Sequence, residues 1–173
     1  MTQKIEYSEP KCQLYLAELF EFLRIPSISA KMEHKGDCRQ AALWLQHKLT
    51  QAGVAKTELM ETAGNPILYG EHLVDPSWPT VLVYGHYDVQ PPEPLGLWHS
   101  PAFEPEIRDE RIYARGACDD KGQLYMHVKA FQELYSSGKL RCNVKFLLEG
   151  EEEIGSPHLE KFLVQNKEKL KQR

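Results

Sequence analysis

The chain has 173 residues, 42% hydrophobic and 27% charged, which is long enough for one domain with a sizeable core and too short for two. Its net charge of −4 excludes the basic surface of a nucleic-acid-binding domain. No apolar run approaches the roughly 20 residues that span a bilayer, and residues 1–6 lack the apolar core of a signal peptide. The four cysteines form no closely spaced pair, so we expect reduced thiols and a cytoplasmic protein.

Two amphipathic helices are predicted in the first third of the chain, over residues 8–24 and 37–52. Ile25-Pro26 ends the first helix, and Gly53 ends the second. Their apolar faces consist of Leu16, Leu19, Phe20 and Leu23 in the first, and Ala42, Leu45, Leu49 and Ala52 in the second. Both helices are expected to cover a sheet.

Beyond residue 56 the sequence alternates between strand and helix patterns. The predicted strands cover residues 57–60, 67–69, 80–84 and 143–148, with a small hairpin over 103–107 and 111–113. Residues 120–135 predict a helix that is apolar nearly all round and therefore well buried, and a last helix begins at Ser156-Pro157. Residues 80–84 are apolar on both faces, as is typical of the middle of a parallel sheet. We therefore expect an α/β three-layer sandwich with a mostly parallel central sheet.

Acidic and histidine residues gather at three places, each at the end of a predicted strand or in a turn. His86 and Asp88 follow the apolar strand 80–84, and Asp119 lies in a glycine-flanked turn. A run of glutamates, 151–153, follows the strand 143–148. Because ligands of open α/β sheets bind beyond the carboxyl ends of the strands, these side chains are expected to lie at one site.

These residue types suit a hydrolytic metal centre. Zinc takes imidazole and carboxylate ligands and keeps a position for water, and a carboxylate can bridge two ions about 3.5 to 4 Å apart. His86 offers the nitrogen, Asp88 an acceptor for the other imidazole N–H, and Asp119 a bridge. One glutamate would bind metal while its neighbour acts as general base.

Each group also has an ordinary interpretation when it is taken alone. A histidine and an aspartate at a strand end are often a surface turn, and paired aspartates before a helix usually cap it. A run of glutamates is most often a solvated face. The joint position of all three groups favours the metal centre.

Three segments of the sequence resemble the N-terminal motifs of one zinc metallopeptidase family. They are Gly-His-Tyr-Asp-Val-Gln-Pro at 85–91, Ala-Arg-Gly-Ala-Cys-Asp-Asp-Lys-Gly at 114–122 and Glu-Gly-Glu-Glu-Glu-Ile-Gly-Ser at 149–156. The family contains aminoacylase, succinyl-diaminopimelate desuccinylase, acetylornithine deacetylase and the carnosinase-like dipeptidases. Tyr87 and the Val-Gln-Pro ending resemble the dipeptidase branch more than the deacylases.

The resemblance implies a role for each motif residue. His86 would bind the first zinc ion, Asp119 would bridge two, and Glu153 would bind the second. Glu152 would be the general base, and Asp88 would support His86. The Asp119–Asp120 peptide is expected to be cis. Because Glu151 adds a third carboxylate, the choice of base and ligand among the glutamates stays open, and Mn²⁺ or Co²⁺ suit the same ligands.

The implied reaction is hydrolysis of a peptide or dipeptide, but the resemblance leaves the ligand set incomplete. Family members are much longer and use a further aspartate beyond Glu153 and a histidine near the far C-terminus, and residues 166–173 supply neither. Many members also form homodimers through a lid domain. Residues 1–173 are therefore expected to be the N-terminal part of a catalytic domain, with weak or partial metal occupancy and little turnover.

Two other functions remain open from the sequence. The chain is alternatively a non-catalytic remnant or an interaction module, which would bind no zinc. As a second alternative it belongs to an N-acyl amino acid deacylase of the same family.

Overall fold

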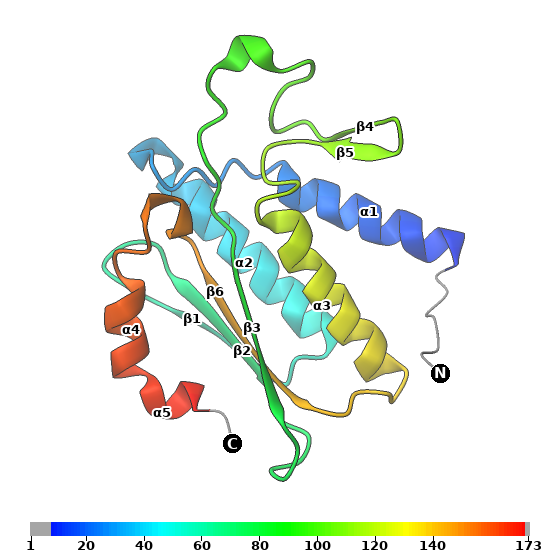
Figure 1. The fold of residues 1–173 in the computed structure, drawn as a ribbon, viewed down its shortest axis with the longest axis vertical. Coiled ribbons are helices and arrows are strands. Elements are labelled where there is room, and N and C mark those ends of the chain that lie inside the picture. Colours follow the sequence, from blue (N-terminus) through cyan, green and yellow to red (C-terminus); the bar gives the residue numbers. More distant parts are fainter. Residues whose placement is uncertain (1–7, 172–173) are drawn as a thin grey trace.

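A four-stranded sheet lies between two layers of helices in the computed structural model, which describes residues 8–171 (Figure 1). The strands are β1 (Lys56–Met60), β2 (Ile67–His72), β3 (Thr80–His86) and β6 (Asn143–Glu149), in the order β1-β2-β6-β3. One face is covered by α1 (Glu9–Leu23), α2 (Lys35–Ala52) and α3 (Lys121–Ser136). The other face carries α4 (Leu159–Gln165) and α5 (Lys167–Leu170).

Three short 3₁₀ turns and a separate hairpin complete the described elements. The turns are Met32–His34, Leu95–Leu97 and Glu152–Ile154. The hairpin pairs β4 (Glu106–Arg108) with β5 (Arg111–Tyr113), and Figure 1 shows it above the helices, away from the main sheet. Asp109 and Glu110 form its turn, both at positive φ, which matches the two-residue connection that suits twisted strands.

Side chains that alternate along the strands give the sheet two apolar faces. Phe146 and Leu148 of β6, both fully buried, pack into the core under α1, α2 and α3. Leu147, between them, points to the other face and packs with Ile67 and Phe162 of α4. Each fully buried side chain of this size contributes about 1.5 to 3 kcal/mol. The three-layer arrangement therefore follows from a strand that carries apolar side chains on both of its faces.

The predicted apolar face of α2 is confirmed, because Ala42, Leu45 and Leu49 are fully buried and Ala52 nearly so. Gly53 ends the helix at φ +98°, as expected. A side chain at Gly53 would be strained, and its Cβ would also lie 2.3 Å from the ring of Tyr135.

The α/β class and the helical layers are confirmed, while the sheet is mixed. Only β3 and β6 run parallel, and β1–β2 and β2–β6 are antiparallel. The loop between β1 and β2 is too short for a crossover, so these strands must pair antiparallel. The parallel character that the sequence predicted thus holds for one pair of strands, the pair that leads to the predicted site.

The predictions of burial for β3 and α3 were wrong in part. Within residues 8–171, β3 lies at an edge of the sheet, where Val81 is 48% exposed and Tyr84 is 46% exposed. On α3, Met126 is 62% exposed, because only one side of the helix contacts the sheet and its neighbours. The apolar composition of β3 and α3 therefore does not show which of their side chains are exposed and which are buried.

The predicted last helix is two short helices rather than one. The chain turns at Gly155 and Ser156, both at positive φ, and α4 begins only at Leu159. Asn166 separates α4 from α5 and caps the first by donating its side-chain N–H to the carbonyl of Phe162, at 2.9 Å.

All four cysteines are free in the described structure. Among the described helices, none combines the length and apolarity that a membrane span requires. Residues 1–6, where the sequence lacks a signal-peptide core, lie outside the described residues.

Candidate metal centre

Three of the predicted ligands meet beyond the carboxyl end of β3. His86, Asp119 and Glu153 each offer one ligand atom, and the three atoms lie within 4.8 Å of one another. The imidazole Nε2 of His86 is 3.0 Å from Oδ1 of Asp119. One nitrogen and two carboxylates are a donor set that zinc and similar divalent ions prefer. The residues present therefore fit the metal that the sequence predicted.

His86 lies at the junction of strand and site. It is the last residue of β3, pairs in register with Glu149 of β6, and has a side chain only 7% exposed. Burial alone would lower the pKa of His86, but the hydrogen bond with Asp88 and the surrounding carboxylates raise the pKa to about 9. A metal must therefore displace a proton that these acids hold on the ring.

Asp88 is fully buried and connects the histidine to the glutamate turn. Its Oδ1 lies 3.3 Å from Nδ1 of His86 and accepts the backbone N–H of Glu152 at 3.2 Å. Its Oδ2 accepts the backbone N–H of Glu153 at 3.1 Å. A carboxylate that accepts charge-assisted hydrogen bonds from two successive amides fixes the direction of that turn. The sequence indicated the contact with His86 but not the contact with the turn.

The three glutamates of the turn do not face the same way. Glu152 Oε2 is 3.8 Å from Nε2 of His86, and Glu153 belongs to the ligand group. Glu151 points away: its carboxylate lies 2.7 Å from Nδ1 of His158 and accepts the backbone N–H of Asn65 at 3.2 Å. The structure thus brings Glu152 and Glu153 to the histidine and engages Glu151 elsewhere.

Asp119 and Asp120 are adjacent in the sequence but differ in burial. The peptide between them is cis, as the resemblance implied. The Asp119 side chain is 72% exposed beside His86, whereas the partly buried Asp120 accepts the backbone N–H of His86 through Oδ2 at 3.1 Å. Burial is the main cause that raises the pKa of Asp120. The sequence offered no signal for this contact, because an aspartate before a helix usually indicates a cap.

Glu149 supports the same turn from the sheet. It is buried on β6 and accepts hydrogen bonds from the hydroxyls of Tyr84, at 2.6 Å, and Ser156, at 2.9 Å, both on Oε1. Burial raises the pKa of Glu149. The hydrogen bond between Ser156 and Glu149 therefore connects the end of the turn to the last residue of β6, next to the proposed ligands.

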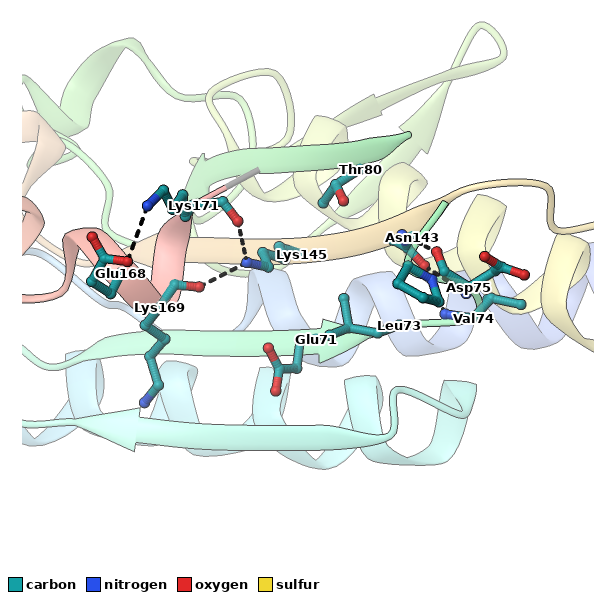
Figure 2. A pocket seen from close by; sticks show the side chains of 11 residues that line it. Glu71, Leu73, Val74, Asp75, Thr80, Asn143, Lys145, Glu168, Lys169 and Lys171 are labelled. Atoms are coloured by element: carbon teal, nitrogen blue, oxygen red, sulfur yellow. Dashed lines mark hydrogen bonds and ion pairs between the residues drawn. The ribbon is translucent and has the colours of Figure 1, made fainter. Parts of the chain in front are cut away.

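Two cavities of similar size lie at different distances from these residues. One of about 670 Å³ opens beside Asp119, between the β4–β5 hairpin and the turn 114–119. The other, also about 670 Å³, lies under α5 at the far end of β3 and β6 and contains none of the predicted site residues (Figure 2). There the dashed lines show Lys145 donating to the carbonyls of Lys169 and Lys171, which fastens α5 to the sheet.

This chain is similar in sequence and in fold to known proteins. The model of peptidase family M20/M25/M40 matches residues 82–172. A cysteinylglycine-S-conjugate dipeptidase from Corynebacterium striatum is 33% identical over 148 residues, which are 84% of this chain and 32% of that protein.

Solved structures of the same family share the fold. An M20 family metallo-carboxypeptidase from Sulfolobus solfataricus superposes with a TM-score of 0.84 at 41% identity, over 91% of this chain and 35% of that one. Human carnosine dipeptidase 1 superposes with a TM-score of 0.83 at 26% identity, over 90% and 35%. The chain thus spans about a third of the length of these relatives.

Proposed function

Because this chain belongs to peptidase family M20/M25/M40, we propose that it carries part of a metal centre that hydrolyses dipeptides. The observation that carries the proposal is the meeting of His86, Asp119 and Glu153 within 4.8 Å, at the end of the one parallel strand pair among the described residues. Three segments far apart in the sequence supply these side chains. The dipeptidase names of several relatives support the substrate class.

In this proposal His86, Asp119 and Glu153 would hold the metal, and Asp119 would be the residue shared between two zinc ions. A bound ion would act as a Lewis acid that polarises the scissile carbonyl and lowers the pKa of a water. Manganese or cobalt would suit the same donors.

The protein's own groups do the rest. Glu152 is the proposed general base, because its carboxylate is near His86 yet its side chain is 44% exposed, so that a water and a substrate can reach it. It takes a proton from the attacking water and returns one to the leaving amine. Asp88 keeps the His86 ring in position and holds the turn that carries both glutamates.

The cavity beside Asp119 is the proposed place for a substrate side chain. Trp98, Tyr113 and Arg115 are among the residues that line it, so it offers apolar surface together with a cation. A dipeptide, with its apolar or weakly polar side chain and its terminal carboxylate, has the chemistry that such a surface accepts.

Residues 1–173 are, in this proposal, the N-terminal part of the catalytic domain. Two protein ligands for each ion are fewer than the three or four that zinc usually has, so the metal should bind weakly to this chain alone. Homodimer formation through a lid domain, and a cytoplasmic location, are proposed for the complete protein.

The test has two stages. Zinc binding to the chain is measured first by competition with a chromophoric chelator. The proteins compared are the unchanged chain, His86→Ala and His47→Ala, a change at an exposed histidine of α2. We expect His86→Ala to remove zinc binding and His47→Ala to leave it unchanged. Equal binding by all three proteins would reject the metal centre.

The second stage measures hydrolysis. The chain is mixed with a fragment that covers the rest of a relative, and S-conjugated Cys-Gly, β-Ala-His and N-acetyl amino acids are offered with zinc, manganese or cobalt. The proposal is supported if the mixture hydrolyses the dipeptides and if Glu152→Gln abolishes this hydrolysis. Preference for the N-acetyl amino acids would favour a deacylase, and a chain that takes up no zinc and only self-associates would favour a non-catalytic remnant or interaction module.

A further inference from the structure

Past the end of β3 the backbone stays paired with its neighbours as in a strand, since the N–H of Tyr87 donates to the carbonyl of Glu149 at 2.9 Å. Val89 pairs with the segment that follows α1. Its N–H donates to the carbonyl of Ser27 at 3.0 Å, and Val89 forms a parallel β-bridge with Ile28. In extended backbone every second side chain points the same way. His86 reaches Asp119, Asp88 reaches the turn, and the third member of this series is Gln90.

Gln90 contacts Glu153 twice with one side-chain amide. Its Nε2 lies 2.8 Å from Oε2 of the Glu153 carboxylate and 3.1 Å from the Glu153 backbone carbonyl oxygen. We propose that Gln90 is a positioning residue, which aligns the Glu153 carboxylate toward His86 and Asp119 for a divalent cation. This inference rests on the proposed metal centre.

The chemistry of an amide suits this task. The NH₂ group is an uncharged donor of two hydrogen bonds, so it orients a carboxylate and leaves the negative charge that attracts the cation. Each carboxylate oxygen has two acceptor sites, so Oε2 keeps the capacity to bind a metal while it accepts from Gln90. A lysine at this position would also donate, but its charge would repel the ion.

The contact is not needed to hold the backbone of the turn. Asp88 already accepts the backbone N–H groups of Glu152 and Glu153 from a fully buried position. Gln90 itself is exposed. The amide of Gln90 instead restricts the orientation of the Glu153 side chain, which would otherwise rotate among several rotamers.

The test is zinc binding to the 173-residue chain, measured by competition with a chromophoric chelator. Outer partners of metal ligands typically change affinity by about 10- to 100-fold, and for an exposed partner we expect about tenfold weaker binding in Gln90→Leu. Gln90→Lys should bind more weakly still, although it keeps a donor. Gln51→Leu, a change of the same kind at an exposed position on α2, should match the unchanged chain.

A second measurement follows the contact without metal. In the metal-free chain, Gln90→Leu should change the carbon-13 shift of the Glu153 carboxylate, while hydrogen exchange of the Glu152 and Glu153 amides stays within about twofold, because Asp88 still holds them. A purely structural role would instead speed that exchange and leave zinc affinity unchanged.

The outcomes separate the two proposals. Zinc affinity of Gln90→Leu close to that of the unchanged chain, or an unchanged Glu153 carboxylate shift, overturns the role of Gln90 and leaves the metal centre standing. If the unchanged chain takes up no zinc, the metal centre itself is rejected, and the role of Gln90 with it.

Discussion

Oδ2 of Asp88 accepts the backbone N–H of Glu153 at 3.1 Å, although the two residues are 65 positions apart in the sequence. This contact joins the end of β3 to the glutamate turn after β6. It makes the positions of the histidine and the proposed glutamate ligand depend on one buried carboxylate.

Asp88→Asn tests that dependence. The amide keeps one acceptor oxygen but turns an NH₂ group toward a backbone N–H, and it loses the charge beside His86. Because a buried donor is left without an acceptor, we expect the free energy of unfolding to fall by about 2 to 3 kcal/mol. Zinc binding should weaken about tenfold. Urea denaturation and a zinc titration measure the two effects.

Asp109→Asn is the matched control for this change. Asp109 lies in the exposed hairpin turn at φ +48°, a conformation that asparagine also tolerates. The control should alter neither quantity. Asp88→Asn with unchanged stability and unchanged zinc affinity would contradict the role given to Asp88.

Gly150 is predicted to be essential for the packing of the turn. A Cβ at this position would lie 2.3 Å from ring atoms of Tyr87, a fully buried side chain whose hydroxyl donates to the carbonyl of Pro66. Gly150→Ala should therefore cost about 1 to 3 kcal/mol of unfolding free energy by overpacking. Thermal unfolding followed by circular dichroism measures the change.

Gly36→Ala gives the opposite expectation for the same substitution. Gly36 lies in α2, and no atom lies within 4 Å of the place that an alanine Cβ would take there, apart from its chain neighbours and the backbone of its own helix. Alanine should therefore stabilise the helix by up to about 1 kcal/mol. Similar losses for both variants would argue against a specific clash at Gly150.

Lys121 is predicted to be structural, despite its place two residues after Asp119. It is fully buried, and its Nζ donates to the carbonyls of Phe22, at 3.0 Å, and Ile25, at 2.6 Å, where α1 ends. Burial lowers the pKa of Lys121 to about 7. Lys121→Met removes the side-chain donor from both carbonyls, which keep the backbone N–H groups of Ile25, at 3.3 Å, and Ser27, at 2.9 Å. The free energy of unfolding should therefore fall by about 1 to 3 kcal/mol.

The control for Lys121 is Lys161→Met on the exposed side of α4, which should change stability by less than about 0.5 kcal/mol. Chemical denaturation compares the three proteins. An unchanged midpoint for Lys121→Met would show that the buried Lys121 side chain does not hold α1 in place.

Stability at acid pH should depend on Glu18. Burial raises the pKa of Glu18, but hydrogen bonds from Lys129, Lys48 and Tyr125 outweigh it and hold the pKa below the ordinary 4.5. A carboxyl with a lowered folded-state pKa contributes stability above its unfolded value, and the contribution is lost as pH falls through the folded value. The unchanged chain should therefore lose stability below about pH 4.5.

Glu18→Gln removes this titration. Its unfolding free energy should be lower at pH 7 and should change less between about pH 5 and pH 3 than that of the unchanged chain. Glu33→Gln, at an exposed position, should follow the unchanged chain. Parallel pH profiles for all three proteins would contradict the assignment.

Local patterns in the sequence determined much of the fold. The spacing of Ala42, Leu45 and Leu49 predicts the buried face of α2, because three to four residues make one helical turn, and Gly53 ends it through its own backbone freedom. The three motifs likewise indicated His86 and Asp119, since strand ends and glycine turns place side chains at the edge of a sheet.

Only the tertiary structure decided how those residues are oriented. Glu151, Glu152 and Glu153 are equivalent in the sequence, and they differ because Asn65 and His158 engage the first while Asp88 directs the other two. Local sequence patterns also do not predict the edge position of β3 or the contact of Gln90 with Glu153. Each of these features depends on segments that are far apart in the sequence. Gln90 and Glu153, for example, are separated by 63 residues. The packing of the whole sheet brings such segments together, and the periodicity of a single segment does not predict it.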